Sequence, residues 1–191
     1  MRKIVTYPNK ILRVKTSEIN VVDEKLKKEI DDLVLVLSKE KGHAAGLAAV
    51  QIGLNRRFFG LLLGEQKKLQ LFINPRIEQT FGDRVKPMMI FDDGKQEEFL
   101  EGCLSFPDLF GVVKRYLKIK ASWDEIKGDK FVRKEAVFEG IEAIAFQHEG
   151  EHLDGILFVD YIKKEGGDLY KFVKDKKIKW SVDKVIEGEI K

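Results

Sequence analysis

The sequence has 191 residues, enough for one domain with a substantial hydrophobic core, and we find no linker, repeat or low-complexity tract. Hydrophobic residues make up 43% and charged residues 35% of the chain, as is usual for a globular protein in water. The formal net charge of +3 is too small to indicate sequence-specific nucleic-acid binding or membrane binding, and no stretch reaches the 18 apolar residues of a membrane span. Cys103 is the single cysteine, which excludes an internal disulfide, and the first residues resemble no targeting signal, so we expect a cytoplasmic protein.

The first long element is a helix predicted over residues 24–41. Apolar residues recur there at helical spacing, lysines and acids take the other face, Asp23 is a plausible N-cap, and Gly42 ends the helix. Residues 43–53 then form a run of small residues around Gln51. This run is either a tight helix or loop packed on the core, or backbone that lines a site with the Gln51 amide as a donor. We interpret His43 as a surface or loop histidine, because it has no partner at ligand spacing.

Most of the remaining chain predicts strands, with a second helix over residues 138–151. Residues 76–100 are expected to form a hairpin or an excursion, with turns at Gly82-Asp83 and at Asp92-Asp93-Gly94. A second hairpin is expected about Lys127-Gly128-Asp129. The expected strands or extended segments are residues 4–7, 57–63, 69–73, 76–81, 85–91, 112–120, 119–123, 130–137 and 157–162. Asn74-Pro75 is expected to end the strand at 69–73, and Arg115 lies in the middle of the strand at 112–120. A short helix near 169–173 and a strand or frayed tail over 178–186 follow.

The second helix carries His148-Glu149-x-x-His152, a spacing that projects both imidazoles from one face, one turn apart. Two imidazoles so placed can hold one divalent metal ion, and a glutamate beside the open side of the ion can take a proton from a bound water. The alternative is a chance match on an ordinary amphipathic helix, a coincidence with odds of roughly a few in a thousand in a chain with so few histidines. We therefore predict an α+β fold: a single domain with antiparallel or mixed sheets around this central helix.

Catalytic sites of this type have a third protein ligand, and its identity bears on the reaction. A third histidine six residues after His152 is absent, because that position is Phe158. Cys103 is a candidate, although an isolated cysteine is most often a small buried hydrophobe. The other candidates are the downstream glutamates, which lie in a charged tail with no helical partner motif: Glu165, Glu187 and Glu189.

Three segments in this order resemble the signature motifs of the peptide deformylase family. They are Gly-Leu-Ala-Ala-x-Gln at residues 46–51, Glu-Gly-Cys-Leu-Ser at 101–105 and Gln-His-Glu-x-x-His-Leu at 147–153. The resemblance covers most of residues 4–162. Weaker landmarks of the family are also matched, at Pro8, Leu12, Arg13, Ile73-Asn74-Pro75, Arg115, Phe158, Asp160 and Tyr161.

The chain departs from the family at a few places. It has Ala44, Val50 and Glu151 where the family usually has glycine, proline and aspartate, and the first two changes lie near the expected substrate cleft. Residues 76–100 are longer than the family leads us to expect, and the tail after residue 162 matches it poorly. We therefore expect one catalytic domain over residues 1–191, with a deformylase-like core at about 4–162 and a lysine-rich C-terminal extension at 163–191.

The resemblance implies removal of the formyl group from N-formyl-methionyl nascent polypeptides by a metal-dependent hydrolase. Fe²⁺ is the expected ion, with Zn²⁺ or Ni²⁺ as substitutes in a preparation. Glu149 is implied as the base, while the Gln51 amide and the Leu104 backbone N–H are implied as donors to the developing oxyanion. The implied metal ligands are Cys103, His148 and His152.

Further residues are expected around this centre. Glu101 and Arg115 could pair behind the cysteine loop and hold it in place. The methionine side chain needs an apolar pocket, for which the candidates are Gly46, Ile144 and Ala145 beside His148, with Phe106 and Phe110 at the rim.

Two other functions remain open at this point, a zinc endopeptidase with the same His-Glu-x-x-His chemistry and a non-catalytic binding protein that keeps the fold and the metal. The intact Glu149 argues against the second. The lysine-rich residues 163–184 are interpreted as a solvated face, with docking to the ribosome near the peptide exit as the alternative.

Overall fold

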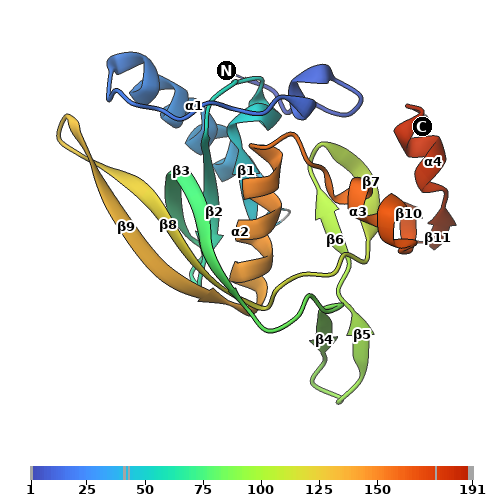
Figure 1. Ribbon diagram of the computed structural model, residues 1–191. Coiled ribbons are helices and arrows are strands. Elements are labelled where there is room, and N and C mark those ends of the chain that lie inside the picture. Colours follow the sequence, from blue (N-terminus) through green and yellow to red (C-terminus); the bar gives the residue numbers. More distant parts are fainter. Residues whose placement is uncertain (1, 41, 43, 175, 189–191) are drawn as a thin grey trace.

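A computed structural model of the chain describes residues 2–40, 42, 44–174 and 176–188 (Figure 1). Its strands form antiparallel sheets. The five-stranded sheet has the order β1 (Gly46–Ala48), β2 (Phe58–Leu63), β3 (Lys68–Phe81), β8 (Lys118–Lys127) and β9 (Lys130–Glu139). The four-stranded sheet has the order β11 (Lys176–Trp180), β10 (Leu169–Val173), β7 (Phe106–Gly111) and β6 (Glu101–Cys103), and the two-stranded sheet is β4 (Met88–Ile90) with β5 (Gln96–Glu98).

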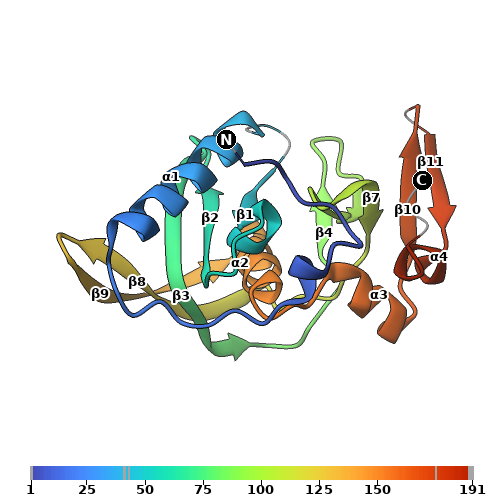
Figure 2. The same cartoon turned by 90° about the horizontal axis from the view of Figure 1, so that it is seen from above.

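Helix α2 (Gly140–His152) lies between the two larger sheets, as the views from the front and from above both show (Figures 1 and 2). The other helices are α1 (Glu24–Lys39), α3 (Phe158–Glu165) and α4 (Val182–Ile186), with 3₁₀ turns at Lys10–Arg13 and Ala49–Ile52. The predicted α+β single domain around a central helix is therefore confirmed. No helix in the described ranges is long and apolar enough to cross a membrane.

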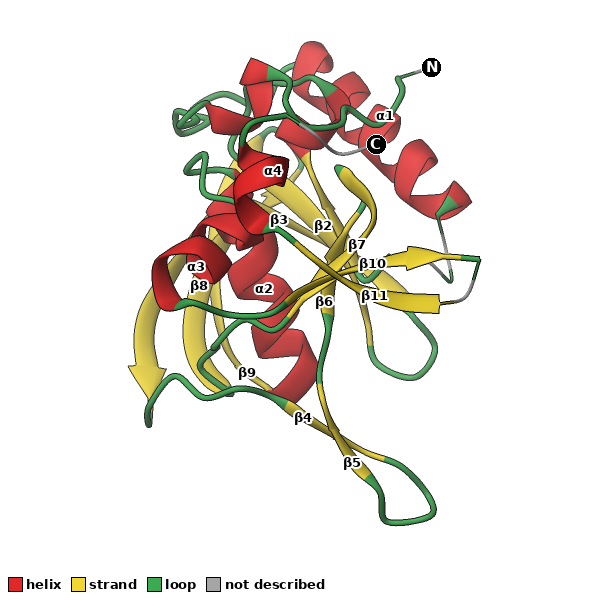
Figure 3. Ribbon diagram, turned by 90° about the vertical axis from the view of Figure 1, so that its right-hand side faces the viewer, coloured by secondary structure: helices red, strands yellow, loops and turns green. Residues whose placement is uncertain are grey.

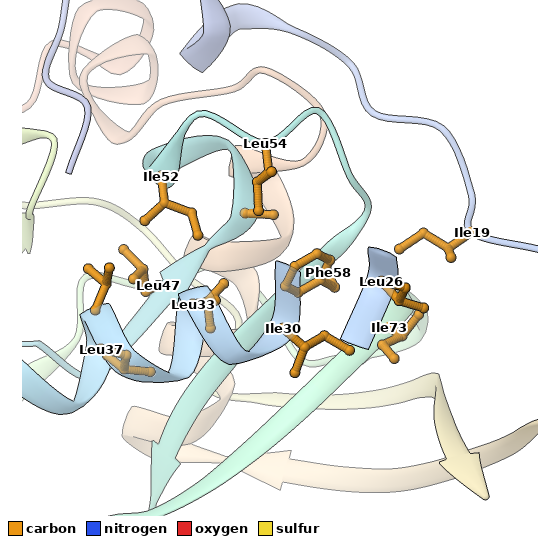
Figure 4. Packing of buried hydrophobic residues seen from close by; sticks show 12 residues of the cluster. Ile19, Leu26, Ile30, Leu33, Leu37, Leu47, Ile52, Leu54, Phe58 and Ile73 are labelled. Carbon is orange, nitrogen blue, oxygen red and sulfur yellow. The ribbon is translucent and has the colours of Figure 1, made fainter. Parts of the chain in front are cut away.

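Helix α1 forms as predicted from its sequence pattern. The Asp23 side chain accepts a hydrogen bond of 2.7 Å from the Leu26 amide and so caps the first turn. The apolar face of the helix packs on β1, β2 and β3, as Figure 4 shows. The helix ends at Lys39, and the part of the prediction that concerned residues 41 and 43 lies outside the described residues.

Helix α2 is buried on almost every side rather than on one face. Phe146 packs at ring-centroid distances of 5.1–5.2 Å against Phe59, Phe72 and Phe138 from the five-stranded sheet. The four-stranded sheet and α3 lie on its other side (Figure 2). A helix enclosed in this way carries its polar side chains into the interior, where they must find partners.

Several predicted strand boundaries are wrong in the middle of the chain. β3 does not end at Asn74-Pro75 but continues to Phe81, with bulges between Ile73 and Arg76 and between Ile77 and Gln79. A bulge tolerates a proline, which has no amide to donate to the ladder. Of the two alternatives for residues 76–100, the hairpin of 76–81 with 85–91 does not form, because β3 pairs with β8 there and residues 88–90 pair with 96–98.

The predicted strand over residues 112–120 is wrong for residues 112–117, whereas residues 118–120 do belong to a strand, β8. The chain leaves β7 at Gly111 and enters β8 only at Lys118. Between them Arg115 makes an isolated bridge with Val85 and turns its side chain into the interior toward two carboxylates. These ion pairs override the alternation of apolar residues that predicted a strand. The predicted hairpin of β8 with β9 is confirmed.

Three further predictions fail near the ends of the chain. Residues 4–7 form no strand, although they are hydrogen-bonded through Val5 N to Gln51 O and Tyr7 N to Ser105 O. Residues 158–165 form helix α3 rather than an extended segment, and the Asp160 carboxylate caps it by accepting from the Leu157 amide at 2.8 Å. Residues 169–173 form β10 rather than a helix, because they pair with the exposed edge of β7. Residues 176–186 then form β11 and α4.

Candidate metal centre

The side chains of Cys103, His148 and His152 meet between β6 and α2. One ligand atom from each of them, a sulfur and two ring nitrogens, lies within 4.8 Å of the others. Cys103 Sγ is 3.3 Å from His152 Nε2, and the two imidazole centroids are 4.9 Å apart at 83°. Cys103 comes from the end of an edge strand, whereas both histidines come from consecutive turns of one helix, so the site forms only when the two elements pack together.

This group fits a single divalent ion. Metal–sulfur and metal–nitrogen bonds of about 2.3 and 2.0–2.1 Å in tetrahedral geometry place neighbouring ligand atoms about 3.3–3.6 Å apart. The 3.3 Å between Cys103 Sγ and His152 Nε2 falls in this range. One thiolate and two imidazoles suit zinc and the later first-row metals. The Nδ1 atom of His148 is held by Glu101 at 2.7 Å, which leaves Nε2 for the ion. Three protein ligands leave a fourth position open.

Glu149 lies beside this group and is only 4% exposed. Its Oε2 atom has no hydrogen-bond partner among the described residues. Burial raises the pKa of Glu149 to about 7; the nearby Glu101 carboxylate adds to the rise and His148 opposes it. A carboxyl group with such a pKa can take up and release a proton near neutral pH, which is what a general base requires.

The short strand β1 approaches Glu149 so closely that only glycine fits at one position. A Cβ atom added to Gly46 would lie 2.7 Å from the Glu149 Cγ and 2.8 Å from its Oε1. Gly46 therefore lets the backbone of β1 form one wall of the site. The residues of the small-residue run that line the cavity are Ala44, Ala45, Gly46 and Gln51.

Gln51 points its amide into the metal centre. Its Oε1 atom accepts from the Ala48 amide at 2.8 Å, which fixes the orientation of the side chain. The Nε2 atom then donates to Ser105 Oγ at 3.3 Å and lies 3.4 Å from Cys103 Sγ. The fixed orientation keeps the Nε2 amide group beside the Cys103 sulfur. Leu104, the other predicted donor, follows Cys103 directly and lines the same cavity.

Behind the ligands lies a buried ion-pair network centred on Arg115, which is 1% exposed. Its Nε and Nη2 donate to the two oxygens of Glu101 at 2.9 and 2.6 Å, and its Nη1 donates to Glu151 at 2.6 Å. The structure thus brings together Glu101 and Arg115, which the sequence predicted as a pair. The network also includes Tyr161, whose hydroxyl donates to Glu151 at 2.9 Å. From the sequence, Tyr161 was recognised only as one of the weaker matches to the family.

Burial and these contacts shift the pKa values of Glu101, His148 and His152. Burial alone would raise the pKa of Glu101, but Arg115 and His148 outweigh it and lower the value to about 2. Burial would lower the pKa of His148, but the Glu101 carboxylate and Cys103 raise it well above its usual range. Burial lowers the pKa of His152 well below its usual value. Glu101 is thus a permanent carboxylate that orients His148 through Nδ1.

A cavity of about 660 Å³ opens onto the metal ligands. Gly46, Ile144 and Ala145, the predicted substrate residues, all line it, as do Phe106 and Phe110. Ala44 lines it too, whereas Val50, next to Gln51 in the sequence, is fully buried in the core cluster around Phe59 and Phe72 and does not form part of the wall. The lining residues that the sequence analysis did not single out include Phe99, Leu100 and Ile141.

Comparison with known proteins supports the resemblance seen in the sequence. The family model described as polypeptide deformylase matches residues 1–167. The peptide deformylase of Nautilia profundicola is 36% identical over 165 residues, 85% of this chain and 88% of that protein. Peptide deformylase 1 of Bacillus subtilis is 34% identical over 166 residues, 86% of this chain and 91% of that protein.

Solved structures agree with the sequence relatives. The crystal structure of peptide deformylase from Thermotoga maritima superposes with a TM-score of 0.70 at 30% identity and covers 84% of this chain and 97% of its own. The Plasmodium falciparum enzyme in complex with an inhibitor has a TM-score of 0.71 at 26% identity and covers 98% of this chain and 96% of its own. The chain therefore belongs to the polypeptide deformylase family, metalloenzymes that remove the N-terminal formyl group from newly made polypeptides.

Proposed function

We propose that this chain, as a single catalytic domain, hydrolyses the formyl amide of N-formyl-methionyl polypeptides at the centre formed by Cys103, His148 and His152. The observation that carries the proposal is the convergence of three ligand atoms within 4.8 Å beside the cavity that Cys103, His148, Glu149 and Gln51 line. A base and an amide donor beside one open metal position are the groups that amide hydrolysis requires.

The arrangement of the sheets supports an extended substrate. β1 and β6 are the edge strands of the two larger sheets, and residues of both line the cavity. A peptide lying between them could use its backbone N–H and C=O groups as an added strand does. In that position the methionine side chain would pack against Ile144 and Ala145 on α2. The formyl group would then lie at the ligands.

The reaction adds water to the formyl carbon and breaks the C–N bond, giving formate and a free amino terminus. A divalent ion at the centre would make water more acidic and polarise the formyl oxygen. Glu149 takes the proton from the attacking water and passes it to the departing amine. The Gln51 Nε2–H and the Leu104 backbone N–H donate to the oxygen on which negative charge develops.

We propose Fe²⁺ as the native ion, because a thiolate with two imidazoles accepts it and the family resemblance favours it. Zn²⁺ or Ni²⁺ can replace it on the same ligands. With a redox-active ion beside the thiolate of Cys103, we expect dilute hydrogen peroxide to inactivate the anaerobically purified enzyme and to oxidise Cys103. Activity and intact mass followed over time test this, with the Ni²⁺-substituted protein as the control. Equal loss of activity in both preparations would contradict the assignment of iron.

We infer that the lysines of residues 163–184 form a solvated face rather than a ribosome-docking surface. Several have partners within the chain: Lys177 lies 4.1 Å from the Tyr170 ring centroid, Lys163 pairs with Asp183 at 3.3 Å, and Lys179 pairs with Asp168.

We propose a cytoplasmic location, because a cysteine outside any disulfide, Cys103, suits a reducing compartment.

Replacement of Lys176, Lys177 and Lys179 by glutamine tests the inference that the lysines form a solvated face. Because strand β10 pairs with β7, substitutions are preferable to truncation, which would uncover a strand edge. We expect the variant to show the same low co-sedimentation with ribosomes as the unchanged protein at every salt concentration. Salt-dependent binding that the substitutions abolish would instead favour ribosome docking.

A further inference from the structure

The hairpin formed by β4 and β5, hereafter the 88–98 hairpin, exposes a run of large apolar side chains. The exposed fractions are 49% for Met88, 46% for Met89, 72% for Ile90 and 42% for Phe91. The hairpin projects from the body of the molecule below β6, as two views at right angles show (Figures 1 and 3). Its two strands pair only with each other among the described residues. Successive side chains of a strand point to opposite faces, so Met88 and Ile90 lie on one face of the hairpin and Met89 on the other. Large apolar side chains gathered and exposed on one element mark a candidate interaction site.

The base of the 88–98 hairpin is continuous with the active-site cavity. Phe99 and Leu100 follow β5 directly and line the cavity together with the β6 residues that lead to Cys103. The Phe99 amide donates to the Pro87 carbonyl at 2.8 Å, which closes the hairpin against this wall. A chain that leaves the metal centre along this wall therefore arrives at the hairpin.

The length of the apolar segment from Met88 to Ile90 corresponds to a few residues of extended polypeptide. Met88 pairs with Glu98 at the base, and Ile90 pairs with Gln96 two positions further out. A strand rises about 3.4 Å per residue, so Ile90 lies about 7 Å beyond Met88. Since an extended chain also covers about 3.3–3.6 Å per residue, about two or three further residues of a peptide would span this distance.

We propose that the 88–98 hairpin binds the part of the substrate polypeptide that follows the residues held in the cavity, through apolar side chains of that polypeptide. The proposal rests on the proposed function, because it takes the cavity as the place of the formyl-methionine. Hydrolysis itself needs nothing from the hairpin. The hairpin would instead favour long, unfolded, apolar chains over short peptides.

The chemistry of the hairpin suits an occupant of variable sequence. Methionine side chains are flexible and polarisable, so Met88 and Met89 can adapt to different apolar partners. Lys86, just before the hairpin, pairs with Glu98 at 2.8 Å, and Lys95 pairs with Glu97, while the turn carries Asp92 and Asp93. The two carboxylates of the turn would disfavour acidic chains and leave apolar or basic ones as the better occupants.

Kinetics on substrates of two lengths test the proposal. The substrates are a formyl-Met tripeptide and two formylated decapeptides, one with leucine and valine and one with serine at positions 5–8. We expect the unchanged enzyme to have a kcat/KM about tenfold higher on the apolar decapeptide than on the serine decapeptide, the effect of burying about one apolar side chain. A variant with Met89→Ser, Ile90→Ser and Phe91→Ser is expected to lose this preference and to keep its kcat/KM on the tripeptide.

A matched control removes exposed apolar side chains elsewhere. Val132 and Val137 on β9 are 37% and 49% exposed, and Val132→Ser with Val137→Ser should leave the preference for the apolar decapeptide intact. Equal unfolding temperatures of the unchanged protein and the two variants would show that the substituted residues do not stabilise the fold. Equal kcat/KM values on the two decapeptides, or a preference that survives in the hairpin variant, would overturn the proposal.

Two other outcomes are distinguishable. If the hairpin instead joins two copies of this chain, sedimentation would show a dimer that the hairpin substitutions dissociate, and this too would overturn the proposal. If no protein released formate from any substrate, the proposed function would fail. Binding of the fluorescently labelled decapeptides, measured by anisotropy, would still report whether the hairpin substitutions weaken affinity for the apolar one by about tenfold.

Discussion

Replacing Glu149 with alanine is expected to lower kcat by about 10²–10⁴-fold, the usual contribution of a positioned general base. The Glu149 side chain is buried beside the ligands, and its Oε2 atom makes no hydrogen bond to a described residue. Glu149 is not one of the three ligand residues. Metal content should therefore stay at one ion per chain. Formate release and metal analysis on the same anaerobic preparation measure both quantities.

The control for this substitution is Glu142→Ala, on the same helix but outside the cavity-lining residues. Glu142 accepts a hydrogen bond from the Gly64 amide at the surface, and its loss should change kcat less than twofold, since it touches no reacting group. Full activity in the Glu149 variant would refute the proposed base. Loss of the metal from that variant would show that Glu149 supports the ligands instead.

Replacing Arg115 with methionine is expected to destabilise the fold by about 3–5 kcal/mol, the usual cost of removing one partner of a buried ion pair. Glu101 and Glu151 would both lose their guanidinium contacts, and Arg115 and Glu101 have side-chain exposures of only 1% and 6%. Because Glu101 also holds His148, we expect metal affinity to fall by about 10–100-fold. Denaturant unfolding and competition with a chelator measure the two effects separately.

An exposed ion pair is the appropriate comparison. Arg76 and Glu18 have side-chain exposures of 57% and 46%, and Arg76→Met should change the midpoint of denaturant unfolding little and leave metal affinity unchanged. Comparing the two variants distinguishes the effect of removing any positive charge from the effect of removing the ion-pair network around Arg115. Unaltered metal affinity in the Arg115 variant would show that the network supports the fold but not the ligands.

Three residues of the candidate site could be predicted from sequence because their spacing is local. His148, Glu149 and His152 occupy consecutive turns of one helix, so their relative positions follow from helix geometry alone. Helix α1 was predictable for the same reason, from its periodicity and its Asp23 cap. Cys103 could be assigned only through the family resemblance, since its approach to His152 depends on how β6 packs against α2.

The failures lie where distant contacts override the local pattern. Residues 169–173 contain Tyr170, Phe172 and Val173, which favour a strand, but their spacing also fits a short helix; the pairing with β7 decides for the strand. Pro75 lies inside β3 because bulges beside it remove the need for its amide hydrogen. The alternation around Arg115 resembled a strand, whereas two buried carboxylates drew that side chain inward. None of these partners can be read from the neighbouring residues.

The most direct test of the account is formate release by the anaerobically purified chain, with its metal content measured, from formyl-Met peptides and from the same peptides without the formyl group. We expect one equivalent of formate for each formylated peptide, no cleavage of any internal peptide bond, and loss of activity when a chelator removes the ion. Cleavage of internal bonds without formate release would show a metallopeptidase and contradict the proposed reaction.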